Sequence, residues 1–198
     1  FFPTEEDHLC SIIADGSGKG VPAALFMVIA KTLIKNHAQS GESPAEIFTA
    51  VNDQLRENNK EGMFVTAWLG ILELSTGKLS YVNAGHNPPL LKTKDGGYQY
   101  FKCRPGFVLA GMEGMVYKQY EGQLEAGDVL YLYTDGVTEA TDLSENLYGE
   151  ERLEKILNAD LNLLPEQLIS AVRQNISQFI GEADQSDDIT MLALRYKG

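Results

Sequence analysis

The sequence predicts an α+β fold in which helices pack outside antiparallel sheets. Two helical stretches lie before residue 60, short apolar runs and turn sequences fill residues 64–134, and two further helical stretches precede one late strand. Because strands and helices do not alternate singly, a parallel Rossmann arrangement is a weak alternative. With 198 residues, 43% of them hydrophobic, the chain is expected to form a single domain, residues 1–198, around a substantial core.

The first expected elements are one strand and two helices. An apolar run at 9–14 predicts the strand, and it leads directly into Asp15. The first helix begins near Lys19 with a proline in its first turn, where the missing N–H is tolerated. It is apolar on almost every side from Val21 to Ile29, so it is expected to be buried. The second helix begins with a capping box at 43–46.

The rest of the chain predicts hairpins, then helices and a final strand. Three hairpins are expected from apolar runs that flank turn sequences: 64–74 with 78–83, 89–92 with 98–102, and 117–123 with 128–134. Helices follow at 150–158 and 165–180, the second with apolar residues at helical spacing. A strand at 189–196 completes the expected order.

Three aspartates, Asp15, Asp135 and Asp187, stand at the ends of strand-like runs. If these strands are antiparallel neighbours, the ends of two meet the start of the third, and the carboxylates meet at one edge of a sheet. Ionised carboxylates crowded beside an apolar core repel one another unless a cation lies among them. Oxygen ligands favour a hard divalent ion such as Mg²⁺ or Mn²⁺. A metal site is therefore the leading interpretation.

Each aspartate also has a purely structural interpretation. Asp135-Gly136 is a common hairpin turn pair, and Asp187-Asp188 fits a solvated loop or a helix cap. The glycine-rich turn at 15–20 matches neither a P-loop nor a dinucleotide-binding loop. Its glycines do allow a backbone carbonyl to approach a metal.

The net charge of −12 argues against nucleic acid or an anionic membrane surface as a partner. The longest apolar stretch, 21–30, is too short to cross a bilayer, so no membrane insertion of this domain is expected. No secretory signal is visible, and Cys10 and Cys103 give no disulfide framework. Reduced thiols and a cytoplasmic location are the expectation.

Four motifs then occur in order. They are Ala-Asp-Gly-Ser-Gly-Lys-Gly-Val-Pro-Ala-Ala at 14–24, Asn-Ala-Gly-His-Asn-Pro-Pro at 83–89, Thr-Asp-Gly-Val-Thr-Glu-Ala at 134–140 and Ser-Asp-Asp-Ile-Thr at 186–190. In order and spacing they closely resemble the SpoIIE/RsbU-type bacterial branch of the metal-dependent serine/threonine protein phosphatases, the PPM superfamily. The resemblance covers essentially the whole chain.

This resemblance implies an α-β-β-α sandwich with two Mn²⁺ or Mg²⁺ ions at one end of its two sheets. By matching position, Asp15 would bridge the ions, and the Gly16 carbonyl would help to ligate one of them. Asp135 and Asp187 would ligate the other, with Asp188 as an outer or alternate ligand. Relatives carry a Gly-Gly-Asp-x-x-Asp strand just before the matching start of this chain. The domain is therefore expected to lack its first N-terminal strand and that motif, including one aspartate ligand.

The implied activity is hydrolysis of phosphoserine or phosphothreonine on a partner protein by a metal-activated water, with Asp15, Asp135 and Asp187 as the catalytic set. The implied substrate is a phosphorylated STAS-type anti-sigma-factor antagonist in a signalling pathway that controls a sigma factor, and a homodimer is a further expectation. The alternatives are a non-catalytic regulatory or scaffold module of the same fold and a phosphatase of small molecules. His86 invites a general-acid role, but we favour a structural role in ordering its loop.

Overall fold

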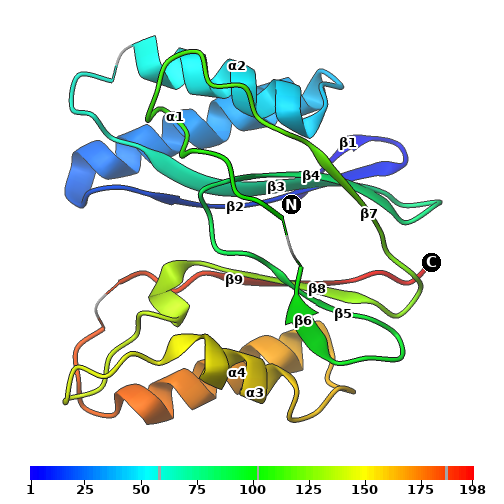
Figure 1. Ribbon diagram of the computed structural model, residues 1–198, viewed down its shortest axis with the longest axis vertical. Helices are drawn as coiled ribbons and strands as arrows, with labels where there is room; N and C mark the ends of the chain where they lie inside the picture. The colour runs from blue at the N-terminus through cyan, green and yellow to red at the C-terminus, as the bar shows by residue number, and fades with distance from the viewer. Residues whose placement is uncertain (58, 102, 186) are drawn as a thin grey trace. The chain divides into compact units, whose positions relative to one another are not determined.

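The computed structural model describes residues 1–57, 59–101, 103–185 and 187–198 (Figure 1). Lys102, at the end of an expected strand, and Ser186, at the start of the fourth motif, lie outside the described residues. The chain forms two compact units, each built from separate stretches of sequence. The first contains 1–86 and 103–124 with residue 198, and the second contains 87–102 and 125–197.

The first unit is a five-stranded antiparallel sheet with two helices on one face (Figure 1). In sheet order its strands are β1 (Phe2–Glu5), β2 (His8–Gly16), β3 (Val65–Glu73), β4 (Lys78–Ala84) and β7 (Tyr120–Gln123). The helices are α1 (Gly20–Gln39) and α2 (Pro44–Glu57). The predicted hairpin of 64–74 with 78–83 is confirmed by the antiparallel pairing of β3 with β4.

Helix α2 has the start and the buried face that the sequence predicts. The Ser43 N–H donates to Glu46 Oε2 at 2.9 Å, and the Glu46 N–H lies 3.5 Å from Ser43 Oγ, which is the expected capping box. Ile47, Phe48 and Val51 on its apolar face are completely buried in the core of this unit. Burial of such side chains contributes about 1.5–3 kcal/mol each.

Helix α1 corrects one expectation. Its inner face is buried at four-residue spacing through Phe26, Ala30, Ile34 and Ala38. Its outer face is apolar but exposed, with Val21, Leu25, Val28 and Ile29 between 52% and 71% accessible. The prediction that this helix is buried all round was wrong, because a helix packed on one face of a sheet covers only one of its own sides.

The second unit is a four-stranded antiparallel sheet, also with two helices on one face (Figure 1). In sheet order its strands are β6 (Tyr98–Tyr100), β5 (Leu90–Lys92), β8 (Val129–Tyr133) and β9 (Met191–Arg195). The helices are α3 (Gly149–Leu157) and α4 (Pro165–Ile180), and a short 3₁₀ helix, η1 (Asp135–Val137), follows β8. Leu153, Leu157, Leu168, Val172 and Ile176 of the two longer helices are buried in a core with the strands.

One predicted hairpin, 117–123 with 128–134, was wrong. Strand β7 pairs with β4 in the first sheet, whereas β8 lies between β5 and β9 in the second. The turn itself forms, since the buried Asp128 carboxylate accepts hydrogen bonds from the N–H groups of Glu125 and Lys94 at 2.9 and 2.8 Å. A turn sequence predicts a reversal of the chain, but the partners of its flanking strands are chosen by tertiary packing.

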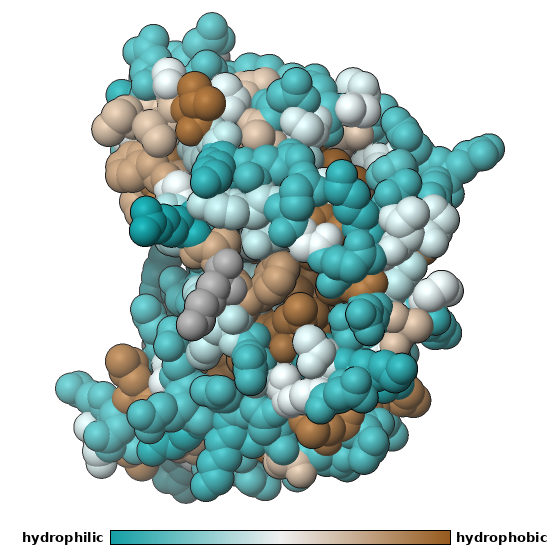
Figure 2. All heavy atoms as spheres, turned by 45° about the vertical axis from the view of Figure 1, so that its right-hand side comes forward, coloured by the Kyte–Doolittle hydropathy of each residue, from teal (hydrophilic) through white to brown (hydrophobic). Residues whose placement is uncertain are grey.

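Two antiparallel sheets and four helices confirm the predicted α+β class. On the face shown in Figure 2, hydrophilic side chains predominate and hydrophobic ones gather in separate patches. Among the described residues, no helix combines the length and apolarity needed to cross a membrane.

Candidate metal centre

Asp15 lies at the end of β2, opposite Thr66 of β3 in the antiparallel register. Its Oδ1 accepts a hydrogen bond from the Gly16 N–H at 2.9 Å. The chain after it is fastened to the start of β3, because the Ser17 N–H donates to the Phe64 carbonyl and the Phe64 N–H donates to Ser17 Oγ. These bonds fix the backbone that presents the Asp15 carboxylate.

Gly16 packs closely against α1. A Cβ at this position would lie 2.7 Å from the Met27 sulfur of α1. The glycine therefore lets the Met27 side chain of α1 pack directly against the end of β2; the ligand role of the Gly16 carbonyl stays a prediction.

Asp135 occupies the first position of η1, immediately after β8. Its backbone carbonyl accepts the Glu139 N–H at 2.7 Å and the Thr138 hydroxyl at 3.3 Å, so its main chain is held within the turn. In the described part of the chain, its Oδ1 is buried and has no hydrogen-bond partner. A buried carboxylate oxygen without a donor is strongly unfavourable. A bound cation would satisfy it, so this residue fits a metal ligand.

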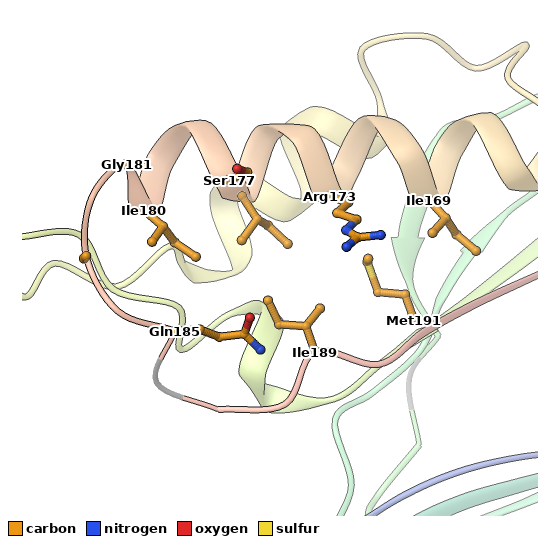
Figure 3. Close-up of a pocket in the computed structure, with 10 residues that line it drawn as sticks. Ile169, Arg173, Ser177, Ile180, Gly181, Gln185, Ile189 and Met191 are labelled. Carbon is orange, nitrogen blue, oxygen red and sulfur yellow. The ribbon is translucent and has the colours of Figure 1, made fainter.

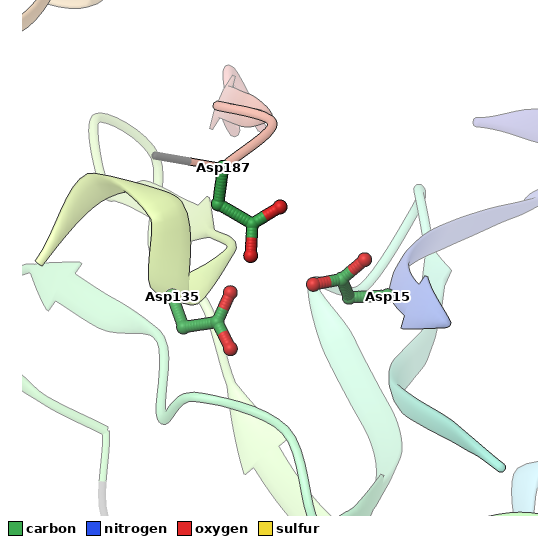
Figure 4. Close-up of side chains that lie close together, drawn as sticks. All are labelled: Asp15, Asp135 and Asp187. Carbon is green, nitrogen blue, oxygen red and sulfur yellow. The ribbon is translucent and has the colours of Figure 1, made fainter. Parts of the chain in front are cut away.

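Asp187 lies in the loop that leads into β9. Its carboxylate accepts the Asp188 N–H at 2.8 Å, and its backbone carbonyl accepts the Gln185 amide, also at 2.8 Å. Asp135 and Asp187 offer carboxylate oxygens within 4.8 Å of one another. Figure 4 shows these two side chains reaching toward each other from η1 and from the loop, and it also draws Asp15 at the end of its strand. The second unit by itself thus presents a pair of carboxylates.

Thr134 connects the two loops of this pair. Its hydroxyl donates to the Asp188 carbonyl at 3.2 Å and accepts the Thr190 N–H at 3.0 Å, while its own N–H donates to the Thr190 carbonyl at 3.1 Å. Gly136 allows the same approach, since a Cβ there would collide with the Asp188 carbonyl oxygen. Asp188 therefore contributes its main chain to the framework that holds Asp187 near Asp135.

The three predicted aspartates do not belong to one sheet. Asp135 follows β8 and Asp187 precedes β9, and these strands are antiparallel neighbours. The expectation that these two aspartates lie at one sheet edge was right. Asp15 lies at the end of β2, which belongs to the first sheet. The expectation of a single sheet edge was wrong, because alternating apolar runs do not reveal which sheet a strand joins.

His86 is a buried residue that orders its loop. Asn83 accepts the His86 N–H at 2.8 Å and donates its amide to the His86 carbonyl at 2.9 Å. The ring Nδ1 lies 3.0 Å from the hydroxyl of Thr66, the residue opposite Asp15. This geometry fits the structural role favoured for His86. The sequence patterns assign no role to Thr66 or Thr134; the position of Thr134 directly before Asp135 is the signal that could have singled it out.

The chain matches the model of the family described as Stage II sporulation protein E (SpoIIE) over residues 5–197. It is 27% identical to Phosphoserine phosphatase RsbU of Bacillus subtilis over 197 residues, covering 99% of this chain and 58% of that protein. It is also 27% identical to Protein IcfG of Synechocystis over 216 residues, covering 96% of this chain and 34% of that protein. The chain therefore spans only part of the curated relatives that it matches.

Solved structures show the same fold. The RsbU and RsbW domains of Rv1364c from Mycobacterium tuberculosis match with a TM-score of 0.83 and 24% identity, over 97% of this chain and 54% of that one. The SiaA-PP2C domain of Pseudomonas aeruginosa matches with a TM-score of 0.83 and 22% identity, over 98% of this chain and 77% of that one. These PP2C-type neighbours confirm the fold class that the four motifs implied. With a family match that runs through both compact units, the chain belongs to the SpoIIE family, as its motifs predicted.

Proposed function

We propose that this chain is the catalytic domain of a metal-dependent phosphatase that removes phosphate from phosphoserine or phosphothreonine in a protein. The observation that carries the proposal is the Asp135–Asp187 carboxylate pair with its buried, unsatisfied Asp135 oxygen. Similarity to proteins named phosphoserine phosphatase, RsbU and RsbP, supports the reaction class.

The proposed metal ligands are Asp15, the Gly16 carbonyl, Asp135 and Asp187, with Asp188 as an outer or alternate ligand. Mn²⁺ or Mg²⁺ fits a set of oxygen donors, and the complete site is proposed to take two ions. A PP2C-type neighbour, RsbX, has been solved in complex with magnesium, which supports a divalent ion. When bound, such ions polarise the phosphoryl oxygens and lower the pKa of a coordinated water.

The residues of the chain supply position and charge. Thr134 and Gly136 hold the Asp187 loop against η1, so the carboxylates need little rearrangement to receive a cation. Fixed carboxylates beside a phosphate dianion would repel it, so the ligand set also makes phosphate binding dependent on the cation. We see no need for a covalent intermediate on the protein, because an activated water can act as the nucleophile.

The proposed substrate is a phosphorylated STAS-type anti-sigma-factor antagonist, and the proposed location is the cytoplasm. Both described cysteines are free, which fits a reducing compartment. A homodimer is proposed as well, following the resemblance to regulatory phosphatases.

The direct test is phosphate release from a phosphoserine STAS-domain protein with Mn²⁺, comparing wild type with Asp135→Asn. Loss of this ligand should reduce turnover by about 10²-fold or more, since it removes charge organised for the transition state. Asp95→Asn is the matched control, because Asp95 is an exposed aspartate in a turn of the same unit. Full turnover by Asp135→Asn would refute the proposal. A wild-type chain that binds the phosphoprotein without turnover would favour the scaffold alternative.

A further inference from the structure

The motif at 83–89 covers the end of β4 and the loop after it, and it contributes no residue to the proposed ligand set. Asn83 fastens this loop in two ways, since its side chain accepts the His86 N–H at 2.8 Å and donates to the His86 carbonyl at 2.9 Å. His86 itself is only 4% exposed. The motif therefore presents a buried imidazole in a fixed position.

This imidazole is connected to the main chain of Asp15 through one hydroxyl. The His86 Nδ1 lies 3.0 Å from Thr66 Oγ1. Thr66 belongs to β3 and stands directly opposite Asp15 of β2 in the antiparallel register. The Thr66 hydroxyl donates to the Asp15 carbonyl at 3.5 Å. Two successive polar contacts, a relay from His86 through Thr66 to Asp15, thus join the 83–89 motif to the backbone of a proposed ligand.

The donors in this relay can be assigned from its chemistry. A threonine hydroxyl has one hydrogen to donate. Because that hydrogen is directed to the Asp15 carbonyl, the hydrogen between Thr66 and His86 must come from the ring. The relay therefore requires a hydrogen on Nδ1 of His86, which fixes the tautomer of a neutral ring.

All three proposed carboxylate ligands accept a side-chain hydrogen bond on their main-chain carbonyl. The donors and distances are Thr66 at 3.5 Å for Asp15, Thr138 at 3.3 Å for Asp135, and Gln185 at 2.8 Å for Asp187. Figure 3 shows Gln185 on the segment that connects α4 with β9. Thr138 and Gln185 lie within three residues of their aspartates, so local sequence suffices for them. Thr66 comes from another strand and contacts His86, so the support of Asp15 depends on tertiary structure.

We propose that His86 and Thr66 are positioning residues for the Asp15 part of the metal site. His86 orients the Thr66 hydroxyl, and this hydroxyl holds the main chain that carries the Asp15 carboxylate and the Gly16 carbonyl. Such outer partners orient metal ligands and raise the affinity of a site. The inference rests on the proposed function, because it takes Asp15 as a metal ligand. It gives the 83–89 motif a role in metal binding and assigns His86 no proton transfer to the substrate.

Calorimetric titration with Mn²⁺ tests the hydroxyl. Thr66→Val keeps the shape of the side chain and removes the donor, so the affinity should fall about tenfold. Thr66→Ser keeps the hydroxyl and should bind Mn²⁺ as the wild type does. Thr32→Val is the matched control, because the Thr32 hydroxyl is exposed on α1 and bonds within its own helix. Wild-type affinity in Thr66→Val, or an equal loss in the Val and Ser variants, would overturn the proposal.

Two substitutions of His86 test the ring position. His86→Asn can place an amide N–H where Nδ1 stands, whereas His86→Gln places it where Nε2 stands. The Asn variant should keep most of the Mn²⁺ affinity, and the Gln variant should lose about as much as Thr66→Val. The double variant His86→Gln/Thr66→Val should lose no more than either single variant, because both substitutions break the same relay. Losses that add in the double variant would show that His86 acts independently of Thr66, and the relay would be wrong.

Nitrogen NMR of the histidine rings gives a readout that requires no metal. The chain has three histidines, so the signals lost in His86→Asn identify those of His86. In metal-free protein, Nδ1 of His86 should have the chemical shift of a nitrogen that carries hydrogen. A bare Nδ1 would overturn the proposal, because the ring could then not donate to Thr66. If the His86 variants do not fold, the Thr66 variants decide the question.

Turnover separates this inference from the proposed function. If the wild-type chain binds Mn²⁺ in a Thr66-dependent way but releases no phosphate from a phosphoserine STAS-domain protein, the positioning role stands and the phosphatase proposal fails. If turnover is normal and Mn²⁺ affinity ignores both Thr66 and His86, the positioning role fails alone. A third result would be wild-type Mn²⁺ affinity in His86→Gln with a lower kcat on the phosphoprotein but not on p-nitrophenyl phosphate. That result would make His86 a general acid and would also overturn the positioning role.

Discussion

The hydroxyl of Thr134 shows how a residue without charge can organise a pair of carboxylates. It is 2% exposed and makes two hydrogen bonds with the main chain around Asp187, one as donor and one as acceptor. These bonds join the end of β8 to the loop before β9. The position of Asp187 relative to Asp135 therefore depends on a side chain that is not a proposed ligand.

Thr134→Val should expose this dependence. Valine keeps the shape but leaves the Thr190 N–H and the Asp188 carbonyl without this partner, which should lower the free energy of unfolding by about 1–3 kcal/mol. The affinity for Mn²⁺ should fall about 10- to 100-fold, as for partners that orient metal ligands. Urea unfolding measures the first effect and calorimetric metal titration the second. Thr134→Ser keeps the hydroxyl, so it should retain most of the stability and most of the Mn²⁺ affinity. Equal losses in the Val and Ser variants would show that the threonine acts through packing and not through its hydroxyl.

Cys10 gives a prediction for alkaline pH. Burial raises the pKa of its thiol from 9.0 to about 12 in the folded state. Between about pH 9 and about pH 12 the unfolded chain binds fewer protons than the folded one, so the free energy of unfolding falls as pH rises through this range. Below about pH 9 the thiol is protonated in both states and this loss of stability is absent. At about pH 10 the free energy of unfolding should be lower by on the order of 1 kcal/mol because of this thiol. The urea midpoint of Cys10→Ala should therefore change less between about pH 8 and about pH 10 than that of wild type, and parallel curves would contradict the assignment.

At the scale of single elements, α1 and α2 show what a sequence pattern can and cannot predict. The α2 capping box and buried stripe were predictable, because capping and periodicity are local properties. The two faces of α1 were not, since both are apolar and only the position of the sheet decides which is buried. The same limit explains the wrong strand pairing of 117–123 with 128–134. It also explains the site. The three aspartates lie at or beside strand ends, which local patterns indicate, whereas Thr66 and Thr134 matter through tertiary hydrogen bonds.

Substitutions on the two faces of α1 should therefore differ sharply. Ile34→Ala removes a side chain that is 1% exposed and should lower the free energy of unfolding by about 2–5 kcal/mol. Leu25→Gln alters a side chain that is 59% exposed and should change it by no more than about 0.5 kcal/mol. Urea denaturation of both variants measures the contrast. A loss of more than about 2 kcal/mol in Leu25→Gln would show that this outer face is covered in solution.

For the whole molecule, the excess of acidic residues sets the response to ions. The formal charge is −12 and the sequence pI is about 4.6, so the folded chain carries net self-repulsion at neutral pH. Added salt screens this repulsion regardless of the identity of the cation. A specific site behaves differently, because a cation that binds only the folded chain stabilises it in proportion to the logarithm of its concentration.

Metal removal separates these two effects. At a free Mn²⁺ concentration about 100 times the dissociation constant, binding should add about 2.7 kcal/mol, which corresponds to a rise in Tm of about 5–10 °C for a chain of this size. EDTA should reverse the shift, and NaCl at matched ionic strength should give only the screening component. Asp135→Asn should lose most of the Mn²⁺-specific rise, because it removes the negative charge and one oxygen of a carboxylate whose buried Oδ1 has no hydrogen-bond donor among the described residues. Asp95→Asn, with the same change of charge in an exposed turn, should keep it. An equal rise in Tm with Mn²⁺ in both variants would mean that the ion stabilises the fold by screening the negative charge of the whole chain. The Asp135–Asp187 pair would then not be a metal site.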